Sequence, residues 1–166
     1  MANTFVLIST VTVGSGGTAS IAFTSIPATY TDLIIKLTTR YNVGGFDGQY
    51  IAFNSSSLTF SGKYALGNGA TTQTGSLAQY IGTVNDSTST ANTFTSTEIY
   101  IPNYAGSTNK SFSVNNATEN NATTSYINIV GGLWATSSAI TSISMTPTSG
   151  LFVEYSSASL YGISST

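Results

Sequence analysis

Apolar and polar residues alternate at every second position along much of the chain. In residues 33–41, four apolar side chains and one threonine fall at odd-numbered positions, whereas Lys36 and Arg40 fall between them. A period of two is the pattern of a β-strand that buries one face. We therefore expect the odd-numbered residues to face a core, and Lys36 and Arg40 to lie on an opposite face that is solvated or part of an interface.

The same alternation predicts about ten short strands separated by turn residues. The alternating runs are residues 7–13, 21–23, 33–41, 49–54, 60–66, 77–84, 93–101, 112–114, 126–134, 140–146 and 151–163. The first two runs are expected to form a hairpin through the glycine-rich turn at 14–17. Residues 67–75 lack apolar anchors and predict the longest exposed loop, and Gly131-Gly132 indicates a bulge.

The pattern favours an all-β fold with little or no helix. No segment holds an apolar stripe with a period of 3.6 residues over three turns. The strand number and the need for a core between two sheets predict one domain over residues 1–166, an antiparallel β-sandwich, with a jelly roll as the favoured topology. An immunoglobulin-like sandwich is the alternative, weakened by the absence of a Cys pair.

Charge and composition exclude most kinds of chemistry. Only 6% of the residues are charged, the net charge is −2, and the chain has no His and no Cys. An imidazole base, a thiol nucleophile, a disulfide and the usual zinc ligand sets are therefore absent. The few, scattered Lys and Arg residues argue against nucleic acid as a partner. We expect a protein that is not an enzyme and needs no cofactor.

Small hydroxyl residues dominate the polar positions, with 26 Ser and 28 Thr, while 40% of the residues are hydrophobic. Disordered chains combine low hydrophobicity with high net charge, so this composition predicts a folded core beneath a polar, nearly uncharged surface. Such a surface suits close contact with copies of itself or with other neutral polymers. No apolar run reaches spanning length, and no basic region precedes Phe5. We expect synthesis in a cytoplasm and no membrane insertion.

Six carboxylates provide the remaining candidates for catalysis or metal binding: Asp32, Asp47, Asp86, Glu98, Glu119 and Glu154. A glycoside hydrolase needs two carboxyl groups about 5 to 9.5 Å apart, and the sequence pairs none. Asp47 and Asp86 occur in turn sequences, and Glu98 and Glu154 fall at solvent-facing strand positions. A calcium site built from Asp32, Asp47 and Asp86 is a minor alternative, because no EF-hand spacing is present. We assign no catalytic and no metal-binding residue.

Four residues are candidate contacts for a glycan or a protein partner: Asn103, Tyr104, Asn109 and Trp134. Tyr104 lies in the segment 102–109 between two asparagines, and Trp134 ends an expected strand. Aromatic rings stack on the apolar faces of sugars, and amides hydrogen-bond their hydroxyls. The alternative interpretation, which we favour, places Trp134 over the sandwich core and packs Tyr104 on its own loop.

Four segments carry a resemblance to a known family. They are TVGSGG at 12–17, IPATYTDL at 26–33, EIYIPNYAGSTNKS at 98–111, and residues 140–163. With them, nearly the whole chain resembles small β-sandwich virion structural proteins of tailed bacteriophages, especially those of aquatic or cyanobacterial hosts. The resemblance implies a capsid decoration protein, of the cement or knob kind, or part of a tail appendage, usually as a trimer. It transfers no catalytic residue.

The leading hypothesis is therefore a bacteriophage virion structural protein that binds other virion subunits, such as the major capsid protein or tail proteins. Such a protein is assembled in the bacterial cytoplasm and ends in the virion, and long-lived assemblies are usually symmetric homo-oligomers. The alternative function is a tail-fibre module that binds glycans of the host surface. A carbohydrate-binding domain unrelated to phage is a third hypothesis.

Overall fold

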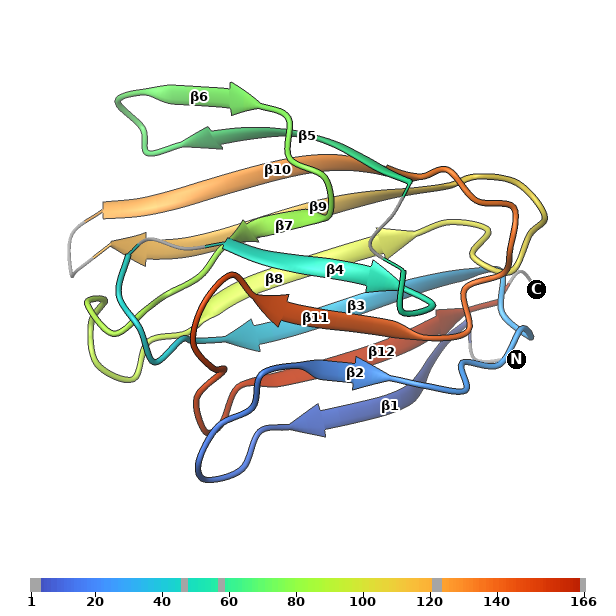
Figure 1. Cartoon of the computed structure of the whole chain (residues 1–166), viewed down its shortest axis with the longest axis horizontal. Helices are drawn as coiled ribbons and strands as arrows, with labels where there is room; N and C mark the ends of the chain where they lie inside the picture. Colours follow the sequence, from blue (N-terminus) through green and yellow to red (C-terminus); the bar gives the residue numbers. More distant parts are fainter. Residues whose placement is uncertain (1–3, 46–47, 57–58, 121–123, 165–166) are drawn as a thin grey trace.

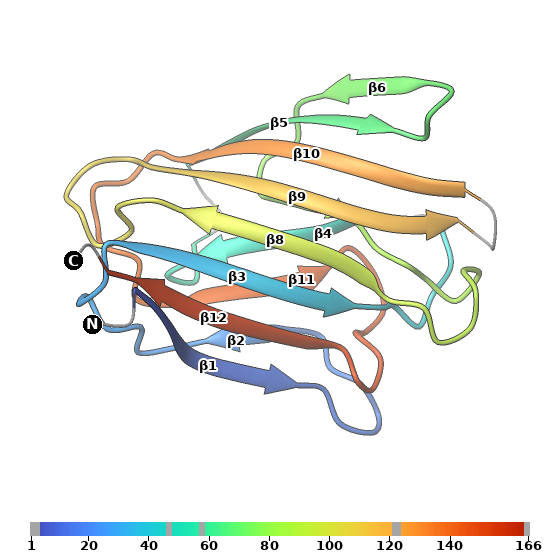
Figure 2. The same cartoon turned by 180° about the vertical axis from the view of Figure 1, so that it is seen from behind.

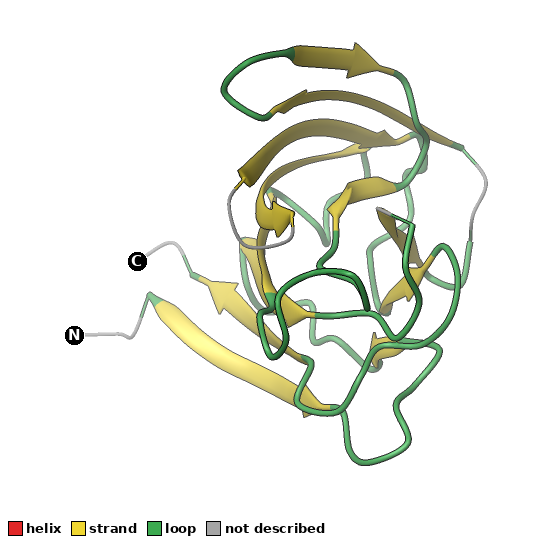
Figure 3. Cartoon of the chain, turned by 90° about the vertical axis from the view of Figure 1, so that its left-hand side faces the viewer, coloured by secondary structure: helices red, strands yellow, loops and turns green. Residues whose placement is uncertain are grey.

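Two antiparallel β-sheets pack face to face (Figures 1 and 3). The computed structural model describes residues 4–45, 48–56, 59–120 and 124–164. Within these ranges the regular structure consists of twelve strands, and none of these residues belongs to a helix able to cross a membrane. The expected all-β sandwich is confirmed, and the finer assignment as a jelly roll stays a prediction.

The larger sheet has eight strands in the order β1-β12-β3-β8-β9-β10-β5-β6. Figure 2 views the molecule from the side of this sheet. Its strands are β1 (Phe5–Thr12), β3 (Asp32–Thr39), β5 (Phe60–Gly67), β6 (Thr72–Gly75), β8 (Thr95–Ile101), β9 (Lys110–Asn120), β10 (Thr124–Trp134) and β12 (Ser157–Ile163).

The smaller sheet has four strands in the order β2-β11-β4-β7. They are β2 (Ile21–Phe23), β4 (Gly48–Phe53), β7 (Tyr80–Thr83) and β11 (Ile143–Pro147). β2 packs against β1 and β12, and β7 packs against β8, β9 and β10. The hairpin of β5 and β6 therefore extends past β7, the last strand of the smaller sheet (Figure 1).

The central strands of the larger sheet have the faces that alternation predicts. In β3, Leu33, Ile35 and Leu37 are buried and Lys36 is exposed. In β8, Thr95, Thr97, Ile99 and Ile101 are buried, and Pro102 follows directly after the strand. The sequence thus placed Lys36 of β3 and Glu98 of β8 correctly on the side that points away from the core.

The hairpin expected from the first two strands is wrong. β1 pairs with β12 and β2 pairs with β11, so the turn at 14–17 carries the chain from the larger sheet to the smaller one. The register of β1 also shifts between Leu7 and Ser9, so that Leu7 is exposed while Val13 is buried. Alternation looks the same whether two consecutive strands pair in one sheet or lie in two facing sheets, so it does not separate these arrangements.

The exposed loop expected at 67–75 is also wrong in part, because residues 72–75 form β6 and pair with β5. The Asn68 side-chain oxygen accepts hydrogen bonds from the backbone N–H groups of Ala70 and Thr71, at 3.0 and 2.8 Å, and closes the turn. The side chains of β6 are mostly exposed. An edge strand of this kind needs no apolar anchor, and the pattern therefore gave no sign of it.

Two further expectations fail near the end of the chain. β10 runs through Gly131 and Gly132 without a register shift, so there is no bulge. A Cβ at Gly132 would lie 2.0 Å from Phe112 Cζ, and the glycine is explained by the space that this ring needs. The last strand begins at Ser157 rather than at residue 151, because residues 154–155 form a turn.

Aromatic side chains fill one end of the space between the sheets. The centroid of the Phe53 ring lies 5.7 Å from that of Phe112 and 5.6 Å from that of Trp134, and both contacts are edge-on. Lys110 is buried at the same end and donates hydrogen bonds to the carbonyl groups of Thr108 and Thr136. Its burial lowers the pKa of the ammonium group.

Buried amides and hydroxyls link the two sheets in the middle of the core. Asn116 of β9 donates to the carbonyl oxygen of Thr83 at 2.9 Å and to Thr97 Oγ1 at 2.8 Å. Asn128 of β10 donates to Asn116 Oδ1 at 2.8 Å and to Thr83 Oγ1 at 2.9 Å. Buried polar groups are expensive unless they are hydrogen-bonded, and this network supplies the partners.

A second polar cluster closes the other end of the sandwich. The Asn85 side chain receives hydrogen bonds from Thr95 and from the hydroxyl of Thr118. Arg40 donates to the carbonyl groups of Thr90 and Thr93 at 2.8 and 2.9 Å, and so holds the segment that precedes β8. The guanidinium group thus has a structural role at this end of the sandwich.

Replacing Asn116 with alanine tests the network, because it removes one amide and leaves the groups of Thr83, Thr97 and Asn128 without that partner. We expect Asn116→Ala to lower the free energy of unfolding by about 2 to 3 kcal/mol. The neighbouring Asn115→Ala, on the exposed face of the same strand, should change it by less than about 0.5 kcal/mol. Urea denaturation measures both, and equal effects at the two positions would contradict the proposed role of the network.

Candidate functional site

Tyr104 lies in the core, although the sequence made it a candidate contact. Its side chain is fully buried, and its hydroxyl donates to the carbonyl oxygen of Pro27. The backbone N–H of Tyr30 donates to the same hydroxyl at 3.4 Å. Burial raises the pKa of this phenol. The ring cannot stack on a ligand, and the interpretation of Tyr104 as a packing residue is the one that the structure supports.

Trp134 is buried as well, against Phe53 and Phe60. Its indole Nε1 has no hydrogen-bond partner among the described residues. Contact of Trp134 with a glycan would need a surface ring, so that expectation is corrected in favour of the alternative, a tryptophan that covers the core. The remaining candidates, Asn103 and Asn109, are exposed in the segment between β8 and β9. Because Tyr104 and Trp134 are buried, neither candidate aromatic ring is available beside these two amides.

Four of the carboxylates, Asp32, Asp86, Glu98 and Glu119, have separate structural partners. Asp32 accepts hydrogen bonds from the Tyr100 hydroxyl at 2.8 Å and from the backbone N–H of Asn103 at 2.9 Å. Glu98 pairs with Lys36, and Glu119 accepts from the backbone N–H of Thr90 at 2.7 Å. No group of three metal-ligating side chains occurs within the described ranges.

The carboxylate of Asp86 accepts hydrogen bonds from the backbone N–H of Thr88 at 2.7 Å and of Gly45 at 2.9 Å. The bond from Thr88 is typical of a turn, as the sequence predicts for Asp86, and the bond from Gly45 ties this turn to the loop after β3. Asp47, the third acid of the calcium alternative, lies outside the described residues.

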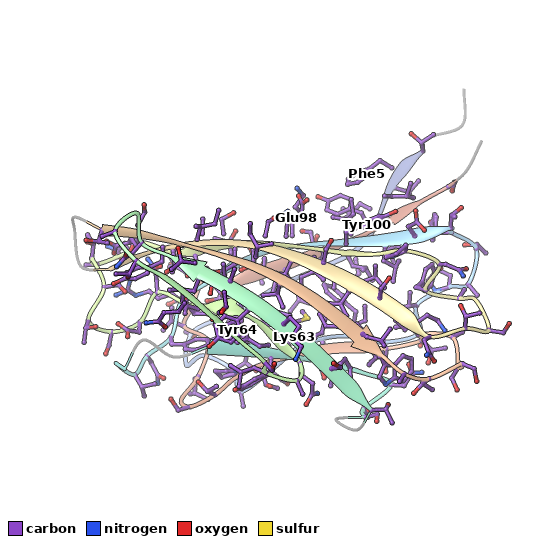
Figure 4. The ribbon with its side chains drawn as sticks, turned by 90° about the horizontal axis from the view of Figure 1, so that it is seen from above. Phe5, Lys63, Tyr64, Glu98 and Tyr100 are labelled. Carbon is purple, nitrogen blue, oxygen red and sulfur yellow. The ribbon has the colours of Figure 1, made fainter. Side chains whose placement is uncertain are left out.

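A further candidate surface is the outer face of the larger sheet, defined as the side chains that point away from the smaller sheet. One row of cross-strand partners crosses all eight strands: Thr10, Ser159, Lys36, Glu98, Asn115, Ile129, Ala65 and Thr74. Phe5, Glu98 and Tyr100 project from this same side in Figure 4. The backbone register therefore builds a continuous surface from segments that are far apart in sequence.

Apolar side chains lie at two places on the outer face. On β10, Ile127 and Ile129 are 54% and 56% exposed. Across the sheet, Phe5 and Leu7 of β1 are also exposed, and the Phe5 ring stacks on Tyr161 at 4.7 Å. Isolated exposed apolar residues are common, but groups of them on one face are typical of interaction surfaces.

The centre of the outer face carries an ion pair between Lys36 and Glu98. Both side chains are well exposed, so the pair adds little to stability. A shallow hollow of about 380 Å³ lies beside the pair, bordered by residues of β3, β8, β9 and β10 that include Asn115 and Ile127. Because the two charges pair with each other, the centre of the outer face carries no net charge.

The sequence predicted only part of this surface, around Lys36 and Glu98, and not the part that β10 contributes. In residues 126–134 both alternating sets contain apolar side chains, so the pattern did not reveal which set faces outward. The structure buries Asn128 and exposes its neighbours Ile127 and Ile129. The outward isoleucines were detectable only once the register of β10 was known.

The comparisons with known proteins assign no identity to this arrangement. No protein-family model matches the chain, and no curated protein matches it either.

The hydroxyl of Tyr100 on the outer face gives a pH-dependent prediction. Its hydrogen bond to Asp32 raises the pKa of the phenol, whose ordinary value is about 10. A raised pKa means that the folded state holds the proton more tightly, so the stabilisation is complete below about pH 10 and is lost as the pH rises through the folded-state pKa.

We therefore expect Tyr100→Phe to be less stable than the parent protein at pH 7, by a difference that shrinks above pH 10. Urea denaturation between pH 7 and 11 measures this difference, with Tyr161→Phe on the same face as the control. A difference that stays constant over the whole range would contradict the assignment.

Proposed function

We propose that this chain is a non-enzymatic structural protein of a tailed bacteriophage particle, and that it binds neighbouring virion subunits through the outer face of its larger sheet. The observation that carries the proposal is the row of outward side chains across all eight strands, with exposed Ile127 and Ile129 and a central ion pair that cancels its own charge. The resemblance of the sequence to phage virion proteins supports the same conclusion.

The partner surface is proposed to be a polar, uncharged protein surface rather than nucleic acid or lipid. The chain has only four Lys and Arg residues, and one of them, Arg40, is occupied by backbone carbonyl groups. Binding to phosphate groups needs clusters of basic side chains. Apolar residues surrounded by hydroxyls and amides match instead the composition of ordinary protein interfaces.

The protomer has a complete core, which suits a component that is added to a particle. Its accessible surface is 7880 Å², close to the value of about 7,800 Å² expected for a monomeric protein of this mass. Within the proposal, a capsid decoration protein of the cement or knob kind is the leading form, as a trimer. Binding only to the assembled particle would stabilise the particle by mass action.

A charge placed on the outer face should prevent incorporation into particles. Ile129→Glu adds a carboxylate next to Asn115 on a side chain that is already exposed, so we expect normal folding but at least tenfold fewer copies per particle. Ala22→Glu, at the exposed position of β2 in the smaller sheet, is the matched control and should be incorporated normally. Quantitative mass spectrometry of purified virions measures the copy number of each.

The same measurement also tests the broader proposal. Many copies on the head are expected for a decoration protein, whereas a few copies at the tail tip would favour an appendage. Absence of the parent protein from purified particles would refute the virion function altogether. Equal incorporation of Ile129→Glu and of the parent protein would instead refute the outer face as the binding surface.

A further inference from the structure

A second feature lies on the other side of the larger sheet, where the β5–β6 hairpin extends past the smaller sheet. A cleft of about 250 Å³ opens there between the hairpin and strands β4 and β7. Its lining includes Tyr50, Tyr64, Gln73, Tyr80, Thr83 and Thr148. None of these residues belongs to the proposed contact surface of the virion protein, and none carries a charge.

Three tyrosines from three strands form the aromatic part of the cleft. Tyr80 of β7 lies between the other two, with ring centroids 5.2 Å from Tyr64 and 6.4 Å from Tyr50. Both contacts are edge-on, at interplanar angles of 61° and 64°. Figure 4 shows Tyr64 on β5, next to Lys63 of the outer face. Tyr50 and Tyr64 are only partly buried, so parts of both rings are accessible.

A hydrogen bond to the buried amide network fixes the position of the Tyr80 ring. The Tyr80 hydroxyl donates to Asn128 Oδ1 at 2.9 Å, and Asn128 is itself held by the buried amide network. Burial raises the pKa of Tyr80, and the neighbouring Tyr64 and Tyr50 raise it further by smaller amounts. The phenol therefore stays protonated and keeps donating this hydrogen bond.

Two glycines leave the space that the rings occupy. A Cβ at Gly48 would lie 2.7 Å from Tyr80 Cε2, and a Cβ at Gly75 would lie 2.7 Å from the Tyr64 hydroxyl oxygen. Side chains at these positions would push the rings away or cover them. The backbone of β4 and β6 thus approaches the aromatic rings closely enough to build the walls of the cleft.

Polar groups complete the lining. Gln73 on β6 is exposed and presents a carboxamide. Thr148 donates its hydroxyl to the carbonyl oxygen of Gly48 at 3.1 Å, and Thr83 accepts from Asn128. These hydroxyl oxygens retain the capacity to accept further hydrogen bonds. A sugar has apolar ring faces and hydroxyl groups around its rim. Tyrosine rings can pack on the faces, and the neighbouring amide and hydroxyl groups can hydrogen-bond the sugar hydroxyls.

We propose that this cleft binds one residue of a neutral saccharide, with the sugar ring against Tyr64 and Tyr50 and its hydroxyls at Gln73 and Thr148. The cleft is smaller than the roughly 300 to 1,000 Å³ of sites for drug-sized ligands, and it therefore accommodates a single sugar unit. The absence of charge from its lining selects against uronic and sialic acids. The proposal is independent of the virion function, and the cleft contains none of the four residues that the sequence offered as candidate contacts.

Saturation-transfer NMR on the full chain tests the proposal with methyl glucoside, methyl galactoside and N-acetylglucosamine as neutral probes, and glucuronate as the charged probe. We expect at least one neutral probe to bind and glucuronate not to bind. Tyr64→Ala should weaken binding by about tenfold, the equivalent of about 1.4 kcal/mol. Tyr155→Asn removes a tyrosine that is 71% exposed outside the cleft, and should leave binding unchanged.

Gln73→Ala is the second variant, because its side chain is exposed on an edge strand and its loss does not disturb the core. It should weaken binding while the unfolding curve stays that of the parent protein. No transfer to any neutral probe in the parent protein, equal binding of glucuronate, or full binding by both variants would overturn the proposal. None of these outcomes affects the copy number in particles, so the two proposals fail separately.

The source of the sugar is resolved by a further pair of measurements. If the cleft recognises the end of a surface polysaccharide, the protein should be retained on host cells and released by the neutral monosaccharide that binds in NMR. If it binds free sugars only, retention on cells should be absent while the NMR result persists. Retention that Tyr64→Ala does not reduce would place cell binding outside the cleft and count against the proposal.

Discussion

Burial of amides and hydroxyls between two sheets is the constraint on which the rest of this structure depends. The inner face of the larger sheet carries Asn116 and Asn128, which are buried as completely as the leucines of a typical core. Their desolvation is compensated only if β7, β8, β9 and β10 keep their register, because a slip by one residue turns each side chain to the opposite face. The hydrogen bonds of Asn128 to Asn116 and to Thr83 therefore fix β7, β9 and β10 relative to one another.

The two surfaces with proposed functions follow from that register and from the unequal width of the sheets. Fixing Asn128 inward forces Ile127 and Ile129 outward, where they contribute to the face proposed to bind virion subunits. The larger sheet has four more strands than the smaller one, so the β5–β6 hairpin is left without a facing strand and the tyrosine-lined cleft opens beneath it. The same buried amide that orients β10 also holds Tyr80 in that cleft.

The sequence predicted the faces of the central strands correctly but not the residues that meet in the candidate sites. The outward faces of β3 and β8 were predicted correctly because the charged residues Lys36 and Glu98 mark the side that points away from the core. For the strand that contains Ile127, the sequence did not predict which side faces outward, because tyrosine and valine lie on one side and isoleucines on the other. The candidate ring of Tyr104 proved to be core, and Tyr50, Tyr64 and Tyr80 were passed over because they are 14 and 16 residues apart in the chain. Only the pairing of β4 with β7, and the contact of the Tyr64 ring of β5 with Tyr80 of β7, bring them together.

The sequence by itself determined the all-β class, the low charge and most strand positions, because each depends on local alternation and on composition. The tertiary structure alone decided which strands are neighbours, which of two apolar faces is buried, and which aromatic rings meet. These choices depend on contacts between residues distant along the chain, such as β1 with β12 and Tyr80 with Asn128. A period of two repeats in every strand and carries no information about the partner across the sheet.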